Sequence, residues 1–164
     1  MHGAGAWCGS NEVVAVQTAL VKYRVAPLAQ VGAQSDVRHL QAITERAKVL
    51  RQFEVIRPGR EQPSGSVTLM WSWLRPEAER RYMEGGLAGL LVTDLGGEGS
   101  LWLLAVASSA TVGDLKLALI WAGKRLPRDS EAERFRWLGV SRHDESLRPF
   151  RCVNEGGYLQ CLPL

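Results

Sequence analysis

The stretch that decides the fold is residues 87–114, LAGLLVTDLGGEGSLWLLAVASSATVGD. It contains two apolar runs, residues 87–94 and 100–108, on either side of a glycine-rich break at residues 96–99. Two partly β-branched apolar runs around such a break are typical of a β-hairpin. The pattern therefore predicts a hairpin that opens the C-terminal half of the chain.

A helix is expected directly after this hairpin. Thr111 is a candidate N-cap, and Asp114 stands three residues later, in an acidic variant of the capping box. Gly123 and Pro127 mark the end, because glycine favours helix C-termini and proline cannot continue a helix. The apolar stripe at helical spacing consists of Val112, Leu115, Leu119 and Ala122. This pattern predicts a helix over residues 111–123.

Further strands are predicted in the rest of the C-terminal half. Residues 133–140 (ERFRWLGV) alternate charged and apolar side chains, as a half-buried strand does. Residues 148–153 and 158–162 flank a turn at residues 154–157 (NEGG). With the hairpin and the helix, the order is β-β-α-β-β, with a short extra strand or turn near Phe150. This order predicts an α+β fold of the β-grasp type.

The N-terminal half repeats this order less clearly. Residues 13–20 and 22–28 are either two strands or, for the first run, a helix capped by Ser10. A helix is predicted at residues 35–52. Its buried stripe consists of Val37, Leu40, Ile43, Ala47 and Leu50. Strands follow at residues 53–56 and 66–74.

Residues 75–86 (RPEAERRYMEGG) separate the two halves. The segment is polar, has a proline at its second position and ends in two glycines, which is typical of a linker. The predicted organisation is an N-terminal tail at 1–12, a divergent β-grasp domain at 13–74, a linker at 75–86 and a second β-grasp domain at 87–164.

Several segments of the C-terminal half resemble ubiquitin-like proteins. The hairpin runs into the helix opening at residues 111–116 (TVGDLK), which is common in ubiquitin-like domains. Residues 126–129 and 134–139 resemble the segment after the helix and the third strand, and residues 146–162 resemble the closing turn and last strand. The resemblance implies two ubiquitin-like domains in tandem, a layout found in vertebrates and in bacterial defence systems.

The resemblance implies a protein that acts by protein–protein recognition, with two departures. A conjugated modifier needs a Gly-Gly tail, because any Cβ would clash in the narrow site of an activating enzyme, whereas this chain ends in Leu162, Pro163 and Leu164. Arg136 stands at an apolar docking position, and burying an unpaired guanidinium is costly. We therefore expect a non-catalytic modifier or fixed interaction module, with protein partners that include enzymes of the ubiquitin-like pathway.

The expected interaction surface combines arginines of the third strand with apolar residues of two other strands. It consists of Arg134, Arg136, Leu159, Trp71 and Trp73. Tryptophan is favoured at interfaces, although core filling is its more common use. The two arginines could equally solvate an exposed face of the sheet.

The charge of the chain leaves room for a second class of function. The net charge is +3, arginine supplies most of the positive charge, and no basic run exceeds two residues. The alternative is a basic nucleic-acid-binding accessory protein, such as a viral one. Its contacts would be Arg134, Arg136, Arg148 and Arg151.

The cysteine spacing and the lack of a credible catalytic set in the sequence argue against catalysis and cofactors. Cys8, Cys152 and Cys161 have no C-x-x-C spacing, so neither a zinc site nor a disulfide framework is expected. We expect an intracellular, cytoplasmic protein without catalytic residues, metal, cofactor or membrane segment. Cys152 and Cys161 fall in facing strands of the last predicted hairpin. They are interpreted as core thiols, with a redox role as the alternative.

Overall fold

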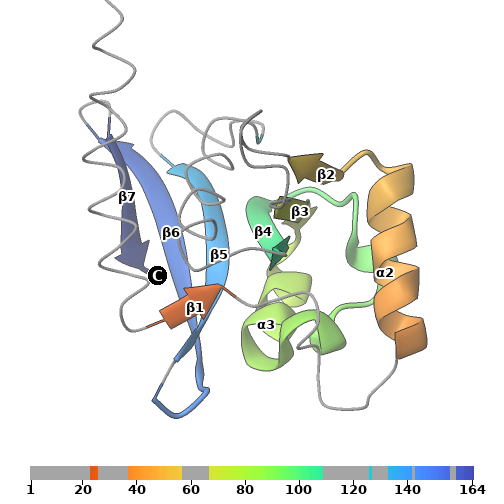
Figure 1. Ribbon diagram of the computed structural model, residues 1–164, viewed down its shortest axis with the longest axis horizontal. Coiled ribbons are helices and arrows are strands. Elements are labelled where there is room, and N and C mark those ends of the chain that lie inside the picture. The colour runs from red at the N-terminus through yellow and green to blue at the C-terminus, as the bar shows by residue number, and fades with distance from the viewer. Residues whose placement is uncertain are drawn as a thin grey trace, which may run out of the picture.

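The computed structural model describes residues 23–25, 37–56, 67–108, 126, 133–141, 143–155 and 158–164. Within these residues the chain folds as a mixed β-sheet with helices packed on one face (Figure 1), which is an α+β architecture. None of the helices in this part of the chain is long and apolar enough to cross a bilayer.

Most of the strands predicted from the sequence are present. The helices are α2 (Val37–Val49) and α3 (Pro76–Gly85), followed by the short 3₁₀ helices η2 (Gly86–Gly89) and η3 (Val92–Asp94). The strands are β1 (Tyr23–Val25), β2 (Phe53–Ile56), β3 (Val67–Leu74), β4 (Ser100–Ser108), β5 (Glu133–Ser141), β6 (Leu147–Glu155) and β7 (Tyr158–Pro163). The predicted helix at 111–123 and the run at 13–20 lie outside the described residues.

The strands form one sheet in the order β2-β3-β4-β5-β6-β7. All neighbours are antiparallel except β4 and β5, which are parallel. β1 stands off this path and pairs with the last residues of β5. The outer strands of the described sheet are therefore β2 at one edge and β7 at the other.

The prediction of a strand at residues 87–94 is wrong, because this segment forms η2 and η3. The segment is rich in leucine because Leu87 and Leu90, three residues apart, are buried in the core beside the helices. Gly86 reverses the chain with φ 64°, and a Cβ at Gly89 would lie 2.3 Å from the carbonyl oxygen of Arg81. The second half of the predicted hairpin, β4, pairs with β3 instead.

The linker predicted at residues 75–86 is also wrong, because this segment is α3. Pro76 occupies the first turn, where its missing N–H costs nothing. Ala78 and Tyr82 lie four residues apart and are both buried, and the Tyr82 hydroxyl donates to the Leu104 carbonyl. The helix therefore connects β3 and β4, which come from the two predicted domains but are neighbours in a single sheet.

One apolar core joins the helices to the sheet. Its fully buried members include Ile43 and Ala47 of α2, Tyr82 of α3, and Trp102 and Leu104 of β4. The Tyr82 and Trp102 rings meet edge-to-face at 5.4 Å between centroids. The intervening β4 residues Leu101 and Leu103 are buried as well. Since β4 is buried on both faces, its sequence reads as a continuous apolar run.

Candidate functional site

The two outer strands, β2 and β7, are the parts of the sheet that can pair with another chain. Each has one strand neighbour among the described residues, β3 and β6 respectively. Figure 1 shows them at opposite ends of the sheet, with β2 next to α2. An outer strand presents backbone N–H and C=O groups that its own sheet does not use.

The register of β2 shows which backbone groups point outward. The Trp71 N–H donates to the Gln52 carbonyl at 3.0 Å, and Phe53 stands opposite Met70. Because bonded and non-bonded pairs alternate in an antiparallel ladder, Phe53 and Val55 occupy non-hydrogen-bonded positions. Their N–H and C=O groups therefore point away from β3.

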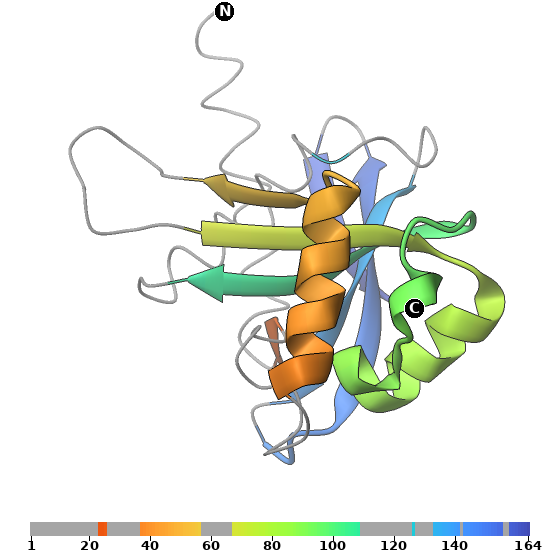
Figure 2. The same ribbon diagram turned by 90° about the vertical axis from the view of Figure 1, so that its right-hand side faces the viewer.

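Apolar side chains are exposed beside this edge. Val49 at the end of α2 is 73% exposed and Val55 on β2 is 50% exposed. Between them Phe53 is half-buried, with the Lys48 ammonium 5.2 Å from its ring centroid. Figure 2 shows α2 lying across the face of the sheet, with its C-terminal end next to β2.

The turn from α2 into β2 is set by a specific cap. The Gln52 N–H donates to the Ala47 carbonyl at 2.8 Å and the Arg51 N–H donates to the Lys48 carbonyl at 3.0 Å. These two bonds form a Schellman motif, which requires a left-handed residue. Arg51 takes that position with φ 57°. The turn thus holds an exposed arginine beside the edge.

Two exposed cations near this turn take part in no ion pair among the described residues. Arg46 and Arg51 are exposed, and neither forms an ion pair within the part of the chain that the structure describes. The neighbouring Lys48 is paired with Glu45 at 3.3 Å. We name the set Arg46, Val49, Arg51, Phe53 and Val55 the β2 corner.

The β7 edge has a different character. The Leu164 N–H donates to the Pro149 carbonyl at 3.0 Å, so Cys161 and Pro163 occupy non-hydrogen-bonded positions opposite Cys152 and Phe150. The backbone nitrogen of Pro163 thus lies on the outer side, where it has no hydrogen to donate. Proline at such a position blunts an edge against pairing.

Arg136, predicted to face a partner, is instead engaged inside the fold. Its guanidinium contacts the carboxylates of Glu79 on α3 and Glu133 on β5, and its side chain is 22% exposed. Glu79 also accepts a hydrogen bond from Trp102 Nε1 at 3.1 Å. Burial acts to lower the pKa of Arg136, but Glu133 and Glu79 outweigh it and raise the pKa. The arginine therefore joins β5 to α3.

The tryptophans predicted for the interaction surface lie on the face of β3 away from the helices. Met70 and Leu74 belong to the core under the helices, so the alternating Trp71 and Trp73 point to the other side. Trp71 is only 9% exposed, and Trp73 is half-buried. They offer little surface to a partner.

The other predicted positions are spread over β5 and β7. Arg134 is half-buried and engaged in an interaction. Leu159 stands on β7 opposite Asn154. Leu162 and Pro163 are also strand residues, and Leu164 is 46% exposed. The structure therefore does not bring the predicted interaction residues together in one place.

The arginines of the nucleic-acid alternative are also divided. Arg148 and Arg151 on β6 are exposed, whereas Arg134 and Arg136 are half-buried. Arg151 stands opposite Arg136, which already contacts two carboxylates. These four residues do not present a continuous basic surface.

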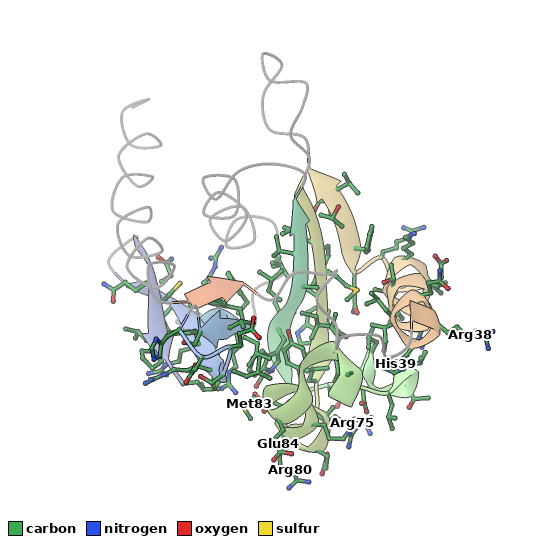
Figure 3. The ribbon with its side chains drawn as sticks, turned by 60° about the horizontal axis from the view of Figure 1, so that its bottom comes forward. Arg38, His39, Arg75, Arg80, Met83 and Glu84 are labelled. Atoms are coloured by element: carbon green, nitrogen blue, oxygen red, sulfur yellow. The ribbon has the colours of Figure 1, made fainter. Side chains whose placement is uncertain are left out.

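The outer side of the helical layer carries mixed charge (Figure 3). Arg75, Arg80 and Glu84 are exposed there, and Arg81 pairs with Asp94 at 2.7 Å. His39 at the start of α2 lies 3.3 Å from the Leu87 carbonyl through Nε2. Interleaved charges of both signs are typical of a solvated face.

No metal-binding group of three or more His, Cys, Asp or Glu side chains occurs among the described residues. Comparisons with protein families, with curated proteins and with solved structures find no match to this chain. The argument for function therefore rests on the geometry of the molecule.

The β2 corner was not anticipated from the sequence, although a signal for it exists. The apolar stripe of α2 predicts burial of Ile43, Ala47 and Leu50, and Val49 lies off that stripe. A valine off the buried stripe at the end of a helix is expected to be exposed, as Val49 is. Its position next to an outer strand becomes visible only in the fold.

Proposed function

We propose that this protein is a non-catalytic recognition module that binds an extended segment of a partner protein at the β2 corner. The observation that carries this proposal is the outward backbone of Phe53 and Val55 beside two exposed valines. Strand addition at a sheet edge uses main-chain hydrogen bonds for affinity and alternate side chains for specificity.

The side chains of the β2 corner indicate the chemistry of the segment. Val49, Val55 and the edge of Phe53 favour apolar side chains on one side of the added strand. Arg46 and Arg51 favour carboxylates near them, because an exposed cation attracts an opposite charge. The proposed ligand is therefore an extended segment in which apolar and acidic residues alternate.

A ubiquitin-like identity is the finer form of this proposal. It is supported by the sequence resemblance at residues 111–116 and 146–162. In this form the partners include enzymes of the ubiquitin-like pathway, and the protein works inside the cell. Strand addition at the β2 corner does not depend on this identity.

A synthetic peptide of alternating Val and Asp residues tests the proposal, with a Val and Lys peptide of equal length as its control. Fluorescence anisotropy with the full chain should show binding of the acidic peptide and at least tenfold weaker binding of the basic one, about 1.4 kcal/mol. Equal binding of the two peptides would contradict the charge preference of the corner.

Two substitutions at one position separate backbone pairing from side-chain contact. V55P removes an outward N–H without removing a bond to β3, since Val55 is in a non-hydrogen-bonded pair. V55T keeps the backbone donor and a similar shape. We expect V55P to abolish binding and V55T to weaken it modestly. Unchanged binding by V55P, with an unchanged circular dichroism spectrum, would exclude strand addition here.

A further inference from the structure

Two thiols face each other directly at the β7 edge. Cys152 on β6 and Cys161 on β7 are register partners, and their Sγ atoms are 3.0 Å apart. Neither is in a disulfide. In the non-hydrogen-bonded pair that they form, opposite Cα atoms are about 4.5 Å apart. That separation lies within the range that a disulfide can span.

The two thiols differ in access to solvent. Cys152 is fully buried and Cys161 is half-buried. Burial raises the pKa of the Cys152 thiol and the neighbouring Cys161 raises it further, while Trp137 acts in the opposite direction. The more accessible Cys161 is therefore the thiol that an external reagent meets first, and Cys152 stands behind it.

The surroundings of Cys152 hold its side chain in place. It stands opposite Phe135, and the next strand pair along stacks Trp137 on Phe150 at 4.7 Å between ring centroids. A close-packed aromatic neighbourhood restricts the rotamers of a small side chain. The pair is thus positioned for bond formation before any oxidant arrives.

We propose that Cys152 and Cys161 are a redox modification site, at which a low-molecular-weight disulfide oxidant closes a bond that locks β7 onto β6. This inference is independent of the function proposed for the β2 corner, because it concerns the opposite edge of the sheet.

The chemistry is thiol–disulfide exchange in two steps. The Cys161 thiol loses its proton and attacks one sulfur of oxidised glutathione, giving a mixed disulfide and releasing one glutathione thiolate, which takes up a proton. The Cys152 thiolate then attacks the Cys161 sulfur and releases the second glutathione. Two protein thiols are oxidised, one glutathione disulfide is reduced, and both hydrogens end on glutathione.

The test uses the full chain in buffers of graded reduced-to-oxidised glutathione ratio, quenched by alkylation and digested with trypsin. Residues 152–164 contain no Lys or Arg, so both cysteines fall in one tryptic peptide. The reduced form carries two alkyl groups. The oxidised form carries none and is lighter than the unmodified peptide by two hydrogens.

The decisive comparison is between folded chain and chain in denaturant. If the fold positions the thiols, the equilibrium constant for the internal disulfide should be at least tenfold larger in the folded state, which corresponds to about 30 mV. Equal constants in the two states, or two alkylated cysteines at every ratio, would overturn the proposal.

A matched variant checks the order of reaction. C152S leaves Cys161 without its partner, so a glutathione adduct should accumulate at Cys161. A wild-type folded chain that also stops at this adduct would show that Cys152 does not resolve it, and would overturn the proposal without reference to any variant.

Discussion

The two edges of the sheet differ in how available their outward backbone groups are to another chain. An outer strand carries unpaired backbone groups that invite pairing with other chains. At β7 the edge is blunted by Pro163 and can be tied to β6 through Cys152 and Cys161. At β2 the outward backbone of Phe53 and Val55 is accompanied by exposed valines and by no proline. The difference indicates that β7 is less suited to pairing with another chain than β2.

This asymmetry limits how copies of the sheet can associate. A chain with two open edges would polymerise, because each molecule could add to both ends of another. A chain with one open edge forms complexes that stop at one partner. Blunting β7 therefore disfavours open-ended polymerisation, because pairing at β2 alone stops at one partner chain.

The largest expected effect on stability comes from the Glu79–Arg136 ion pair between α3 and β5, near the middle of the sheet. E79A removes the carboxylate that contacts Arg136 and accepts from Trp102 Nε1, and leaves a mostly buried guanidinium without one of its partners. We expect a loss of about 3 kcal/mol in the free energy of unfolding, measured by urea denaturation. E77A, an exposed carboxylate on the same helix, is the control and should stay within about 0.5 kcal/mol.

The same variant tests whether the two edges belong to one cooperative unit. Amide hydrogen exchange should accelerate in β2 and β7 together, because a single sheet connects them. Faster exchange in β7 with unchanged protection in β2 would mean that the edges unfold separately, as two tandem domains would.

The next effect concerns the β7 edge alone. Closing the Cys152–Cys161 bond lowers the conformational entropy of the unfolded chain over a loop of roughly ten residues. The folded state is therefore stabilised by about 2–3 kcal/mol. Urea denaturation with and without a reducing agent measures this difference. The C161S chain should show none. Amide exchange should slow most in β6 and β7, where the bond also limits local opening, and to a smaller extent in β2, because one sheet connects the two edges. Unchanged exchange in β6 and β7 would contradict the proposed bond.

A smaller effect is expected from restoring the missing donor at β7. P163V returns an outward N–H to this edge and replaces proline with a residue that favours strands. We expect weak, concentration-dependent self-association that sedimentation velocity detects and that the native chain does not show. The double variant with V55P distinguishes β7–β7 pairing, which persists, from β7–β2 pairing, which is lost.

The sequence predicted individual strands better than their pairing. The sequence predicts β2, β3 and β4 close to their observed bounds, because each strand has its own apolar pattern. The local pattern does not predict that β4 pairs with β3, since pairing depends on contacts between distant residues. The leucine-rich run at residues 87–94 fits both a strand and short helical turns, because a short apolar run is compatible with several kinds of structure.

The predicted linker failed for a related reason. In α3 only Ala78 and Tyr82 are buried, so a helix essential to the core has the composition of an exposed segment. At the site level, Trp71 and Trp73 were selected for their residue type, whereas their burial depends on the whole sheet. The blunting proline at position 163 and the off-stripe Val49 were both readable from the sequence, but their meaning depends on which strands become edges.

The smallest expected effect separates charge from shape at the β2 corner. Arg51 occupies a left-handed position with φ 57°, which disfavours residues that carry a Cβ. R51G should therefore raise the free energy of unfolding by about 0.5–1 kcal/mol. It also removes an exposed cation, which should weaken binding of the Val and Asp peptide by roughly two- to fivefold.

R46A is the matched control, because it removes the other exposed cation of the β2 corner from a helical position where glycine has no advantage. R46A should weaken binding of the acidic peptide to a similar extent, without raising the free energy of unfolding. If R51G stabilises the chain and leaves peptide affinity unchanged, the arginine serves only the turn, and charge has no part in what distinguishes β2 from β7. If both variants weaken binding of the peptide while only R51G stabilises the fold, the β2 edge selects its ligand by charge as well as by backbone pairing.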